Sequence, residues 1–378
     1  ELCNLEIIKE NLEKLLVNSV SQQMLADVPI GAFLSGGIDS STIVALMQSQ
    51  SSIPIKTFSI GFTEKEYDES KYALKIAKYL STDHNELILS PKDVINSITN
   101  IAGLYDEPFA DSSQIPTYLI CNLAKRDVTV ALTGDAGDEL FCGYNRYKYA
   151  STLWPLIKKS PKILKNFLNS SINSISPNQI KYILDKLNIS NNWNLIGDKV
   201  YKIANTLDCN DINHLYEKLI SNAFDDTSLL LNDNFENKKF VETPAFKINE
   251  VEYLMLLDLI NYLPNDILTK VDRASMGNSL ETRIPFLDNR VVEYAWQIPL
   301  DYKLKKTNNK VINKWILKEI LYKYIPEEFF DRPKSGFGIP LGEWFRGPLK
   351  EWAEDLISEN LLKKYNLIDS KIVQNIWN

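Results

Sequence analysis

Histidine and cysteine are both scarce in this sequence. Its 378 residues include two histidines, His84 and His214, which nearly excludes a histidine-based catalytic triad or a histidine-rich metal site. The four cysteines are scattered and form no Cys-x-x-Cys pair, so the sequence predicts buried free thiols and neither a disulfide framework nor a zinc site. The chemistry of the protein therefore has to come from carboxylates, lysines, arginines and backbone groups.

An excess of basic residues and long apolar runs are also missing. The formal net charge is −7 and the isoelectric point about 5.2, which argues against nucleic acid as a partner, because a nucleic-acid binder needs a basic surface. No apolar run reaches the length of a membrane span and no signal peptide opens the chain, so we expect a cytoplasmic protein with no membrane partner. At 378 residues, two domains are the default expectation.

The most informative stretch is a glycine-paired turn that follows an apolar run. The run Ile30–Leu34 ends at residues 35–41 (SGGIDSS), and residues 42–47 have the character of a buried helix. A strand, a tight glycine loop and a helix N-terminus, in this order, bring free backbone N–H groups and the positive end of a helix dipole to one point, which suits phosphate. The loop is not a Walker A motif, because it lacks the lysine that ends one.

Apolar strands and amphipathic helices alternate over the first 150 residues. The expected strands are 30–34, 55–62, 84–89 and 128–132, and the expected helices are 4–24, 42–47, 69–80, 93–104 and 115–125. This alternation is typical of an α/β fold with a doubly wound, mostly parallel sheet. We predict an N-terminal helix and linker over residues 1–24, an α/β domain over 25–150, and a mainly helical region over 151–378 that completes the active site.

Three carboxylates follow the fourth expected strand. Ligands of such sheets lie beyond the carboxyl ends of the strands, so the loops after Leu34, Ile60 and Leu132 should share one cleft. The loop after Leu132 contains three acidic residues within residues 133–139 (TGDAGDE), which is more than the capping of the next helix needs. Because Mg²⁺ takes one or two carboxylates plus phosphate oxygens, we predict that Asp39 and Asp138 bind it.

Sequence patterns become weak after residue 150 and return near residue 250. Residues 151–240 are rich in Asn, Lys, Ser and Ile and indicate little beyond helices and polar loops. Three further motifs follow, namely KVDRASM (270–276), LETRIPFLD (280–288) and RPKSGFGIP (332–340). The last motif would pass for an ordinary connector if it stood alone.

The motifs SGGIDS, LTGDAGDELFCGY, KVDRASM, LETRIPFLD and RPKSGFGIP, in this order, together resemble the synthetase domain of the asparagine synthetase family. The resemblance runs from about residue 20 to the end and implies a sheet of the ATP-pyrophosphatase type, with ATP and Mg²⁺ as cofactors. Family members usually carry an N-terminal glutaminase domain that starts with a nucleophilic cysteine, which the internal Cys3 cannot replace. We therefore expect the ammonia-using half of a longer protein, with the glutaminase domain present in the full-length chain.

The resemblance also implies a mechanism and roles for single residues. A carboxylate attacks the α-phosphorus of ATP to give an acyl-adenylate and pyrophosphate, and ammonia then displaces AMP. Lys334 would stabilise the charge that develops at the α-phosphate, Arg273 would lie near the phosphates, and Asp135 would handle the ammonia. The pyrophosphate would be held by Ser35, Gly36, Gly37, Asp39, Ser40 and Ser41. The adenosine site would be lined by Phe33, Ile60, Thr133 and Gly134.

Two departures from the family pattern leave the acceptor open. Well-described asparagine synthetases have Ser-Gly-Glu where this chain has Thr133-Gly134-Asp135, and Asp135 is one methylene shorter. They also place a threonine and an arginine, implicated in aspartate binding, where residues 109–113 (FADSS) stand here. Aspartate is therefore the default acceptor, and the alternative is a sugar uronic acid or another carboxylate of surface polysaccharide biosynthesis.

Two hypotheses from other classes fit the sequence less well. A non-catalytic nucleotide-binding module would be expected to lose the cation and lysine positions, yet Asp39, Asp138 and Lys334 are all present. A tRNA-modifying relative would need a basic face and often paired cysteines, and the sequence has neither.

Overall fold

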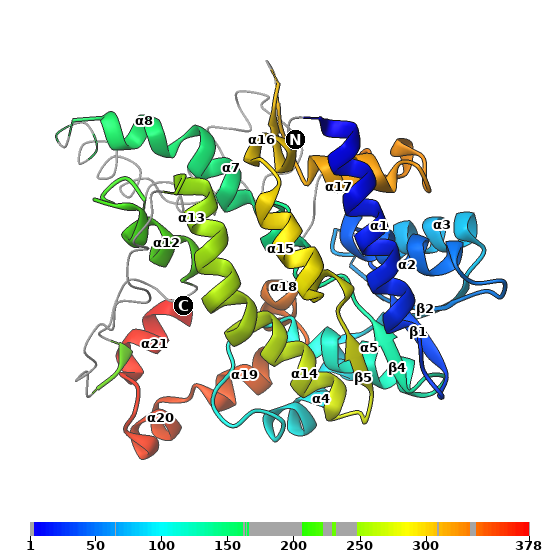
Figure 1. Ribbon diagram of the computed structural model, residues 1–378. Coiled ribbons are helices and arrows are strands. Elements are labelled where there is room, and N and C mark those ends of the chain that lie inside the picture. Colours follow the sequence, from blue (N-terminus) through cyan, green and yellow to red (C-terminus); the bar gives the residue numbers. More distant parts are fainter. Residues whose placement is uncertain are drawn as a thin grey trace. The chain divides into compact units, whose positions relative to one another are not determined.

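The computed structural model groups the chain into two compact units (Figure 1). One unit contains Glu1–Tyr144 and Met255–Leu361, and the other contains Asn145–Leu254 and Leu362–Asn378. The structure describes residues 4–64, 66–161, 163, 165, 206–221, 229–231, 248–307, 310–332 and 338–377. The division into segments 1–24, 25–150 and 151–378 stays a prediction.

The first unit is built on a five-stranded parallel sheet in the order β3-β2-β1-β4-β5. Its strands are β1 (Ile30–Phe33), β2 (Lys56–Phe62), β3 (Asp83–Leu89), β4 (Val130–Leu132) and β5 (Glu281–Arg283). The strand order runs outward from β1 in both directions, as in doubly wound sheets, so the predicted α/β fold is confirmed. The carboxyl ends of the two central strands, β1 and β4, meet at the point where the order reverses.

The four strands that apolar patterning predicts are present, and β5 was missed. Strand β4 is buried at all of its three positions, as expected for the middle of a parallel sheet. Strand β5 has the sequence Glu-Thr-Arg, pairs in parallel with β4, and has no apolar run that would mark it. Its two charged side chains form an ion pair in which Arg283 Nε lies 2.6 Å from Glu281 Oε1.

Helices flank the sheet strands of the first unit (Figure 1). In its first half they are α1 (Leu5–Gln23), α2 (Ile38–Ser49), α3 (Ser70–Leu80), α4 (Pro91–Ala102), α5 (Gln114–Lys125) and α6 (Gly137–Leu140). In its second half they include α14 (Thr269–Met276), α15 (Asn289–Gln297), α16 (Leu300–Lys303), α17 (Trp315–Leu321), α18 (Leu341–Arg346) and α19 (Lys350–Leu356). Short 3₁₀ turns lie at η3 (Pro285–Leu287) and η4 (Glu327–Phe329).

Local signals place the helix starts to within a few residues. Helix α4 begins at Pro91 behind a capping box between Ser90 and Asp93, which satisfies two backbone groups at its N-terminus. At the start of α3, Asp68 Oδ1 accepts a hydrogen bond from the Ser70 N–H at 3.0 Å, and the capping position is Glu69. A π-helix, η2 (Asp258–Leu268), runs directly into α14 and contains Pro264. Such wide turns are frequent at functional sites.

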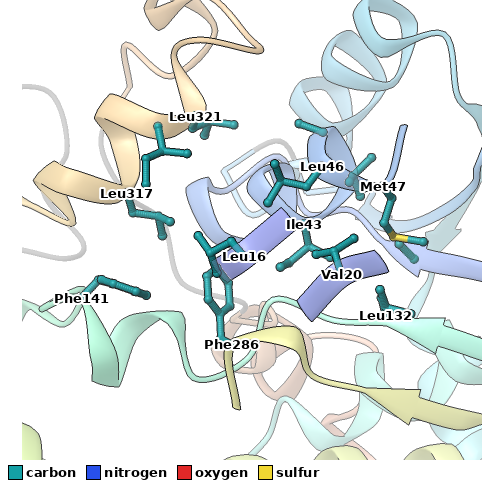
Figure 2. Close-up of a cluster of buried hydrophobic side chains, with 14 of the residues drawn as sticks. Leu16, Val20, Ile43, Leu46, Met47, Leu132, Phe141, Phe286, Leu317 and Leu321 are labelled. Atoms are coloured by element: carbon teal, nitrogen blue, oxygen red, sulfur yellow. The ribbon is translucent and has the colours of Figure 1, made fainter. Parts of the chain in front are cut away.

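Two hydrophobic cores stabilise the first unit, one on each face of the sheet. Val130 and Leu132 pack into the first core and Ala131, between them, into the second, because side chains alternate along a strand. Figure 2 shows the first core, where side chains of α1, α2 and α17 meet those of β4 and η3. Burying a leucine such as Leu46 contributes about 1.5–3 kcal/mol, so these contacts hold the N-terminus of α2 firmly against β1.

The second unit is mostly helical where the structure describes it. Its helices include α7 (Asn145–Thr152), α8 (Trp154–Lys159), α12 (Ile212–Ile220) and α21 (Ser370–Trp377). Helix α13 (Glu250–Leu257) begins in this unit and α20 (Glu359–Tyr365) ends in it. Its core is small and is formed by Trp154, Ile157, Leu207, Cys209 and Leu215.

The predictions about cysteines and about membrane-spanning helices can be compared with the described residues. Cys121, Cys142 and Cys209 are buried free thiols, as predicted, and Cys3 lies outside the described part of the chain. None of the helices in the described ranges has both the length and the apolarity that a membrane span requires.

Candidate functional site

The loop between β1 and α2 is closed on itself by serine hydrogen bonds. The Ser35 N–H donates to Ser40 Oγ at 3.2 Å, and the Gly37 N–H donates to Ser35 Oγ at 3.3 Å. Gly36 adopts φ +74°, a left-handed conformation that favours glycine, and a Cβ there would lie 2.9 Å from the Ala73 nitrogen. The loop therefore ends at the N-terminus of α2 in a tight turn of the kind that binds anions.

The loop after β4 packs directly onto the first turn of α2. A Cβ on Gly134 would lie 2.6 Å from the Ser40 nitrogen, and one on Gly137 would lie 2.5 Å from Asp39 Oδ1. Gly134 allows the two backbones to approach each other closely, and Gly137 leaves room for the Asp39 side chain. Thus the predicted phosphate loop and the predicted acidic loop share one edge of the sheet, at the carboxyl ends of β1 and β4.

Asp39 and Asp138 are joined there by a lysine that sequence analysis did not single out. The Lys314 ammonium forms ion pairs with Asp39 Oδ2 and with Asp138 Oδ1. The lysine side chain is 5% exposed, whereas the side chains of Asp39 and Asp138 are 21% and 22% exposed. One buried cation therefore holds two carboxylates that would otherwise repel each other.

A hairpin holds the backbone of Lys314 in place. Strands β6 (Leu304–Lys306) and β7 (Val311–Asn313) form it, and Lys314 follows with φ 52°, before α17. The Lys314 N–H donates to the Phe141 carbonyl at 3.1 Å, and Asn313 Nδ2 donates to the Gly143 carbonyl at 2.9 Å. Gly143 has no room for a Cβ, because Asp138 Oδ1 and Lys314 Cε lie against it. These contacts position the lysine stem beside Asp138.

The donor set at this point fits a magnesium ion bound together with phosphate. Burial alone would lower the pKa of the Lys314 ammonium, but Asp138 and Asp39 hold that pKa above its ordinary value. Both carboxylates converge on one position, at the ammonium. Across the described ranges no group of three or more His, Cys, Asp or Glu side chains is arranged to hold a metal. Two carboxylates suffice for Mg²⁺, which retains oxygen ligands from waters and phosphates.

A second buried lysine lies next to the acidic loop. Lys270 of α14 forms an ion pair of 2.6 Å with Asp111, the acidic member of the FADSS stretch. Burial acts to raise the pKa of Asp111, but the Lys270 ammonium holds it below its usual range. Burial also raises the pKa of the Asp135 carboxyl, while a 2.7 Å hydrogen bond from Thr133 Oγ1 and the Lys270 charge act in the opposite direction. Asp135, Lys270 and Asp111 thus belong to one electrostatic cluster.

Asp266 and Tyr105 extend this cluster and keep free hydrogen-bonding capacity. Burial, followed by the negative charge of Asp111, raises the pKa of Asp266 to about 6. Within the described part of the chain, Asp266 Oδ1 and the Tyr105 hydroxyl are buried without a hydrogen-bond partner. A buried polar atom normally has a partner, so these two atoms are suited to a hydrogen-bonding ligand.

A cavity of about 630 Å³ opens beside Tyr105. It is lined by α4, by the loop that leads to α5, and by α18 and α19, and its wall is largely apolar and aromatic, with Phe109, Phe345 and Trp352 among its residues. Ala110 and Ser112, which flank Asp111, also line it. Asp106 and Glu107 are its charged residues, and no lysine or arginine is found among the described residues of its wall. The cavity therefore lies beside the residues that flank Asp111, the partner of Lys270.

The remaining predicted site residues are placed as follows. Phe33 and Ile60 lie on the sheet and contribute to its second core, with Ile60 5% exposed. Arg273 lies on α14 and forms an ion pair with Asp106, and its role near the phosphates stays a prediction. Lys334 falls outside the described residues, although Arg332, two positions earlier, is described.

Arg332 links the RPKSGFGIP motif to the phosphate loop. Its Nη2 donates to the Gly36 carbonyl at 2.9 Å and its Nη1 lies 3.2 Å from Glu69 Oε1. The guanidinium carbon lies 3.8 Å from the centre of the Tyr72 ring. Arg332 therefore fixes the peptide that gives the loop its left-handed turn.

Lys314, Lys270, Asp111, Asp266 and Tyr105 were missed by sequence analysis. Lys314 stands in a lysine-rich stretch that contains no motif, so nothing local marks it. Lys270 opens the KVDRASM motif, which was noted for Arg273, and Asp111 was noted as a departure from a pattern. The available signal was that a lysine in one motif could pair with an aspartate in the other.

Comparisons with known proteins agree with this geometry. A family model described as asparagine synthase matches residues 11–378. The chain is 31% identical over 361 residues to asparagine synthetase [glutamine-hydrolyzing] 1 of Bacillus subtilis, a match that covers 95% of this chain and 54% of the relative. It is 25% identical to asparagine synthetase [glutamine-hydrolyzing] 3 of the same organism, over 96% of this chain and 53% of the relative.

A relative with a different name also matches over most of the chain. Amidase chyE of Penicillium rubens is 23% identical over 404 residues, covering 98% of this chain and 58% of the relative. The chain thus spans about half the length of the curated relatives it matches.

Proposed function

The chain belongs to the asparagine synthase family, and from this premise we propose that it activates a carboxylic acid with ATP and converts it to an amide with ammonia. The observation that carries the proposal is the convergence of the closed glycine loop with Asp39 and Asp138 at the carboxyl ends of β1 and β4. A phosphate-binding loop without a Walker lysine, beside a carboxylate pair, suits the release of pyrophosphate.

In the first step, an oxygen of the acceptor carboxylate attacks the α-phosphorus of ATP, and the bond to the bridging oxygen of pyrophosphate breaks. The N–H groups at the start of α2 and the Ser35–Ser41 loop bind the departing pyrophosphate. Asp39 and Asp138 would hold Mg²⁺, which neutralises charge on the pyrophosphate when bound. Lys334 would stabilise the charge that develops at the α-phosphate, since its motif is tied to the loop through Arg332.

In the second step, ammonia attacks the acyl carbon, the bond to AMP breaks, and one proton leaves the nitrogen. Asp135 is the base we propose for that proton. Burial raises its carboxyl pKa, so that it holds a proton better than an exposed aspartate would, and Thr133 orients it. Lys270 lies close enough to limit that rise and keep the carboxylate available.

The decisive test is isotope exchange between pyrophosphate and ATP, measured with and without a carboxylic acid. Exchange that depends on an acceptor supports the proposal. Formation of ADP instead of AMP would show that the bond between the β and γ phosphates is the one broken, and the proposed function would be wrong.

Aspartate is the default acceptor, because the relatives from Bacillus subtilis are named for asparagine synthesis. The cavity supports a second candidate. Aspartate carries a second carboxylate and would be expected to need a cation, yet no lysine or arginine is found among the described residues of the cavity wall, where Asp106 and Glu107 supply negative charge. An acceptor with one carboxylate and several hydroxyls, such as a uronic acid, would match that lining and the free Asp266 Oδ1.

The two acceptors are compared directly by measuring exchange with aspartate and with glucuronate at equal concentrations. A higher rate with the uronic acid selects the second candidate and leaves the adenylation chemistry unchanged. The nitrogen source is tested on the same chain by supplying either ammonium or glutamine. We expect amide from ammonium alone, and a glutaminase domain in the full-length protein would supply ammonia from glutamine.

A further inference from the structure

The Lys314 ammonium occupies the position at which a cation would be bound by Asp39 and Asp138. It forms ion pairs with one oxygen of each, and its own side chain is almost fully buried. Two carboxylates and one lysine leave this point with an excess of one negative charge. A divalent ion in place of the ammonium would cancel that excess, so the two cations compete for the same oxygens.

We propose that Lys314 is an internal cation that holds the Asp39–Asp138 pair in the nucleotide-free enzyme and yields this position to Mg²⁺. The inference rests on the proposed function in one respect, namely that these two carboxylates bind the metal. It concerns the metal-free protein, for which no role of Lys314 follows from the reaction itself.

The arrangement combines a fixed backbone with a movable charge. The Lys314 N–H is bonded to the Phe141 carbonyl, and the preceding Asn313 side chain is bonded to the Gly143 carbonyl, so the main chain is held at both residues. The ammonium, by contrast, lies at the end of a flexible four-carbon stem. It can leave the two carboxylates by rotation of that stem, with no movement of the hairpin.

A lysine suits this role better than an arginine does. Its ammonium is a compact point charge that two carboxylates can share, whereas a planar guanidinium favours bidentate contact with one. Loss of the lysine would remove the positive charge that lies between two neighbouring carboxylates, which destabilises a partly buried site. A metal ion that binds both carboxylates would restore the balance.

Lys314→Met tests the inference, because methionine keeps the length of the stem and removes the charge. The matched control is Lys303→Met, which removes another buried lysine of the same unit, one whose ammonium lies 5.4 Å from the centre of the Trp296 ring and not between the two aspartates. Binding of Mn²⁺, as a spectroscopic substitute for Mg²⁺, is measured by electron paramagnetic resonance without ATP. We expect Lys314→Met to bind Mn²⁺ about tenfold or more tightly than the unmodified chain, and Lys303→Met to bind it unchanged.

Thermal unfolding gives a second readout that is independent of activity. In the presence of a chelator both variants should melt at a lower temperature than the unmodified chain. Addition of Mg²⁺ should raise the melting temperature of Lys314→Met and leave that of Lys303→Met unchanged. Unaltered Mn²⁺ affinity in Lys314→Met, or equal responses of the two variants to Mg²⁺, would overturn the inference.

A double variant covers the case in which Lys314→Met does not fold. Asp138→Asn together with Lys314→Met leaves a single carboxylate, so repulsion is gone, and we expect this chain to fold without metal and to be more stable than Lys314→Met alone. If the double variant fails to fold as well, Lys314 is required for reasons other than the carboxylate pair and the inference is wrong. None of these measurements uses catalytic turnover, so their outcome is separate from that of the pyrophosphate exchange assay.

Discussion

Two buried lysines of the first unit balance their carboxylates in different ways. At the phosphate end, Lys314 forms ion pairs with both Asp39 and Asp138, and each of the three residues approaches from a different element. At the other end, Lys270 forms an ion pair with Asp111, and Asp266 Oδ1 stays buried without a hydrogen-bond partner among the described residues. The first region shares one cation between two carboxylates, whereas the second joins one cation to one carboxylate, beside a carboxylate oxygen that can accept a further hydrogen bond.

This difference indicates a division of labour within the site. A region in which one buried cation already pairs with two carboxylates is suited to the invariant part of the reaction, which is the binding of metal and pyrophosphate. A region with an unpartnered carboxylate oxygen and an adjoining apolar cavity is suited to the part that varies, which is the acceptor. Four predictions test this comparison.

The largest effect is expected at the phosphate end. Asp39→Asn and Asp138→Asn should each reduce acceptor-dependent pyrophosphate exchange by about 10²- to 10³-fold, because each removes a full charge at the point where charge is stabilised. The measurement is exchange as a function of Mg²⁺ concentration. Asp83→Asn, which breaks an exposed pair with Lys56, is the control and should retain nearly full activity. Wild-type turnover at low Mg²⁺ in either variant would remove that residue from the metal site.

A smaller and more selective effect is expected where the two regions meet. Asp135→Asn should reduce amide formation about 10²-fold while pyrophosphate exchange changes much less, because the carboxylate is needed for the ammonia proton and not for adenylation. The test compares the amide formed with the AMP released. An equal decrease in both steps would assign Asp135 to the phosphate end.

The next effect is expected from the contact between Arg332 and Gly36. Arg332→Gln should reduce exchange about tenfold, chiefly through a higher KM for ATP, because the Gly36 carbonyl loses the hydrogen bond that orients the loop. Arg332→Lys keeps the charge and should recover part of the loss. Arg290→Gln, on α15 and exposed, serves as the control. An unchanged KM in Arg332→Gln would show that the loop needs no support from this motif.

The smallest effect concerns the stability of the acceptor end. Because the pKa of Asp266 is raised to about 6, the folded protein binds more protons at this residue than the unfolded chain does between about pH 4 and pH 6. Its contribution to the free energy of unfolding therefore falls as the pH rises through that interval, by about 1 kcal/mol once partial exposure is taken into account. Asp266→Asn should lack this slope.

The measurement is urea unfolding at several pH values. A slope that is identical in Asp266→Asn and the unmodified chain would show that the carboxylate of Asp266 is not perturbed. Addition of the acceptor should also protect this region, since a ligand that donates a hydrogen bond to Asp266 Oδ1 binds only the folded state. Protection by a uronic acid but not by aspartate would support the second candidate.

The sequence by itself was sufficient for the elements whose signals are local. The glycine loop is recognised from the amino acids of residues 35–41, and β1, β2, β3 and β4 are recognised from their apolar patterning. The α/β fold and the meeting of two loops at one edge of the sheet could therefore be predicted. Strand β5 could not, because three residues of mixed polarity become a strand only when β4 offers them a partner.

Only the tertiary structure decided how the charges are paired. Lys314 lies 275 positions after Asp39, and Lys270 lies 159 positions after Asp111, so no local pattern connects either lysine to its carboxylates. A lysine in a lysine-rich sequence is by default a solvated side chain. It becomes a buried counter-ion here because the sheet, the hairpin and the end of the π-helix bring distant residues within a few ångströms of one another, and at such distances charge interactions are strong.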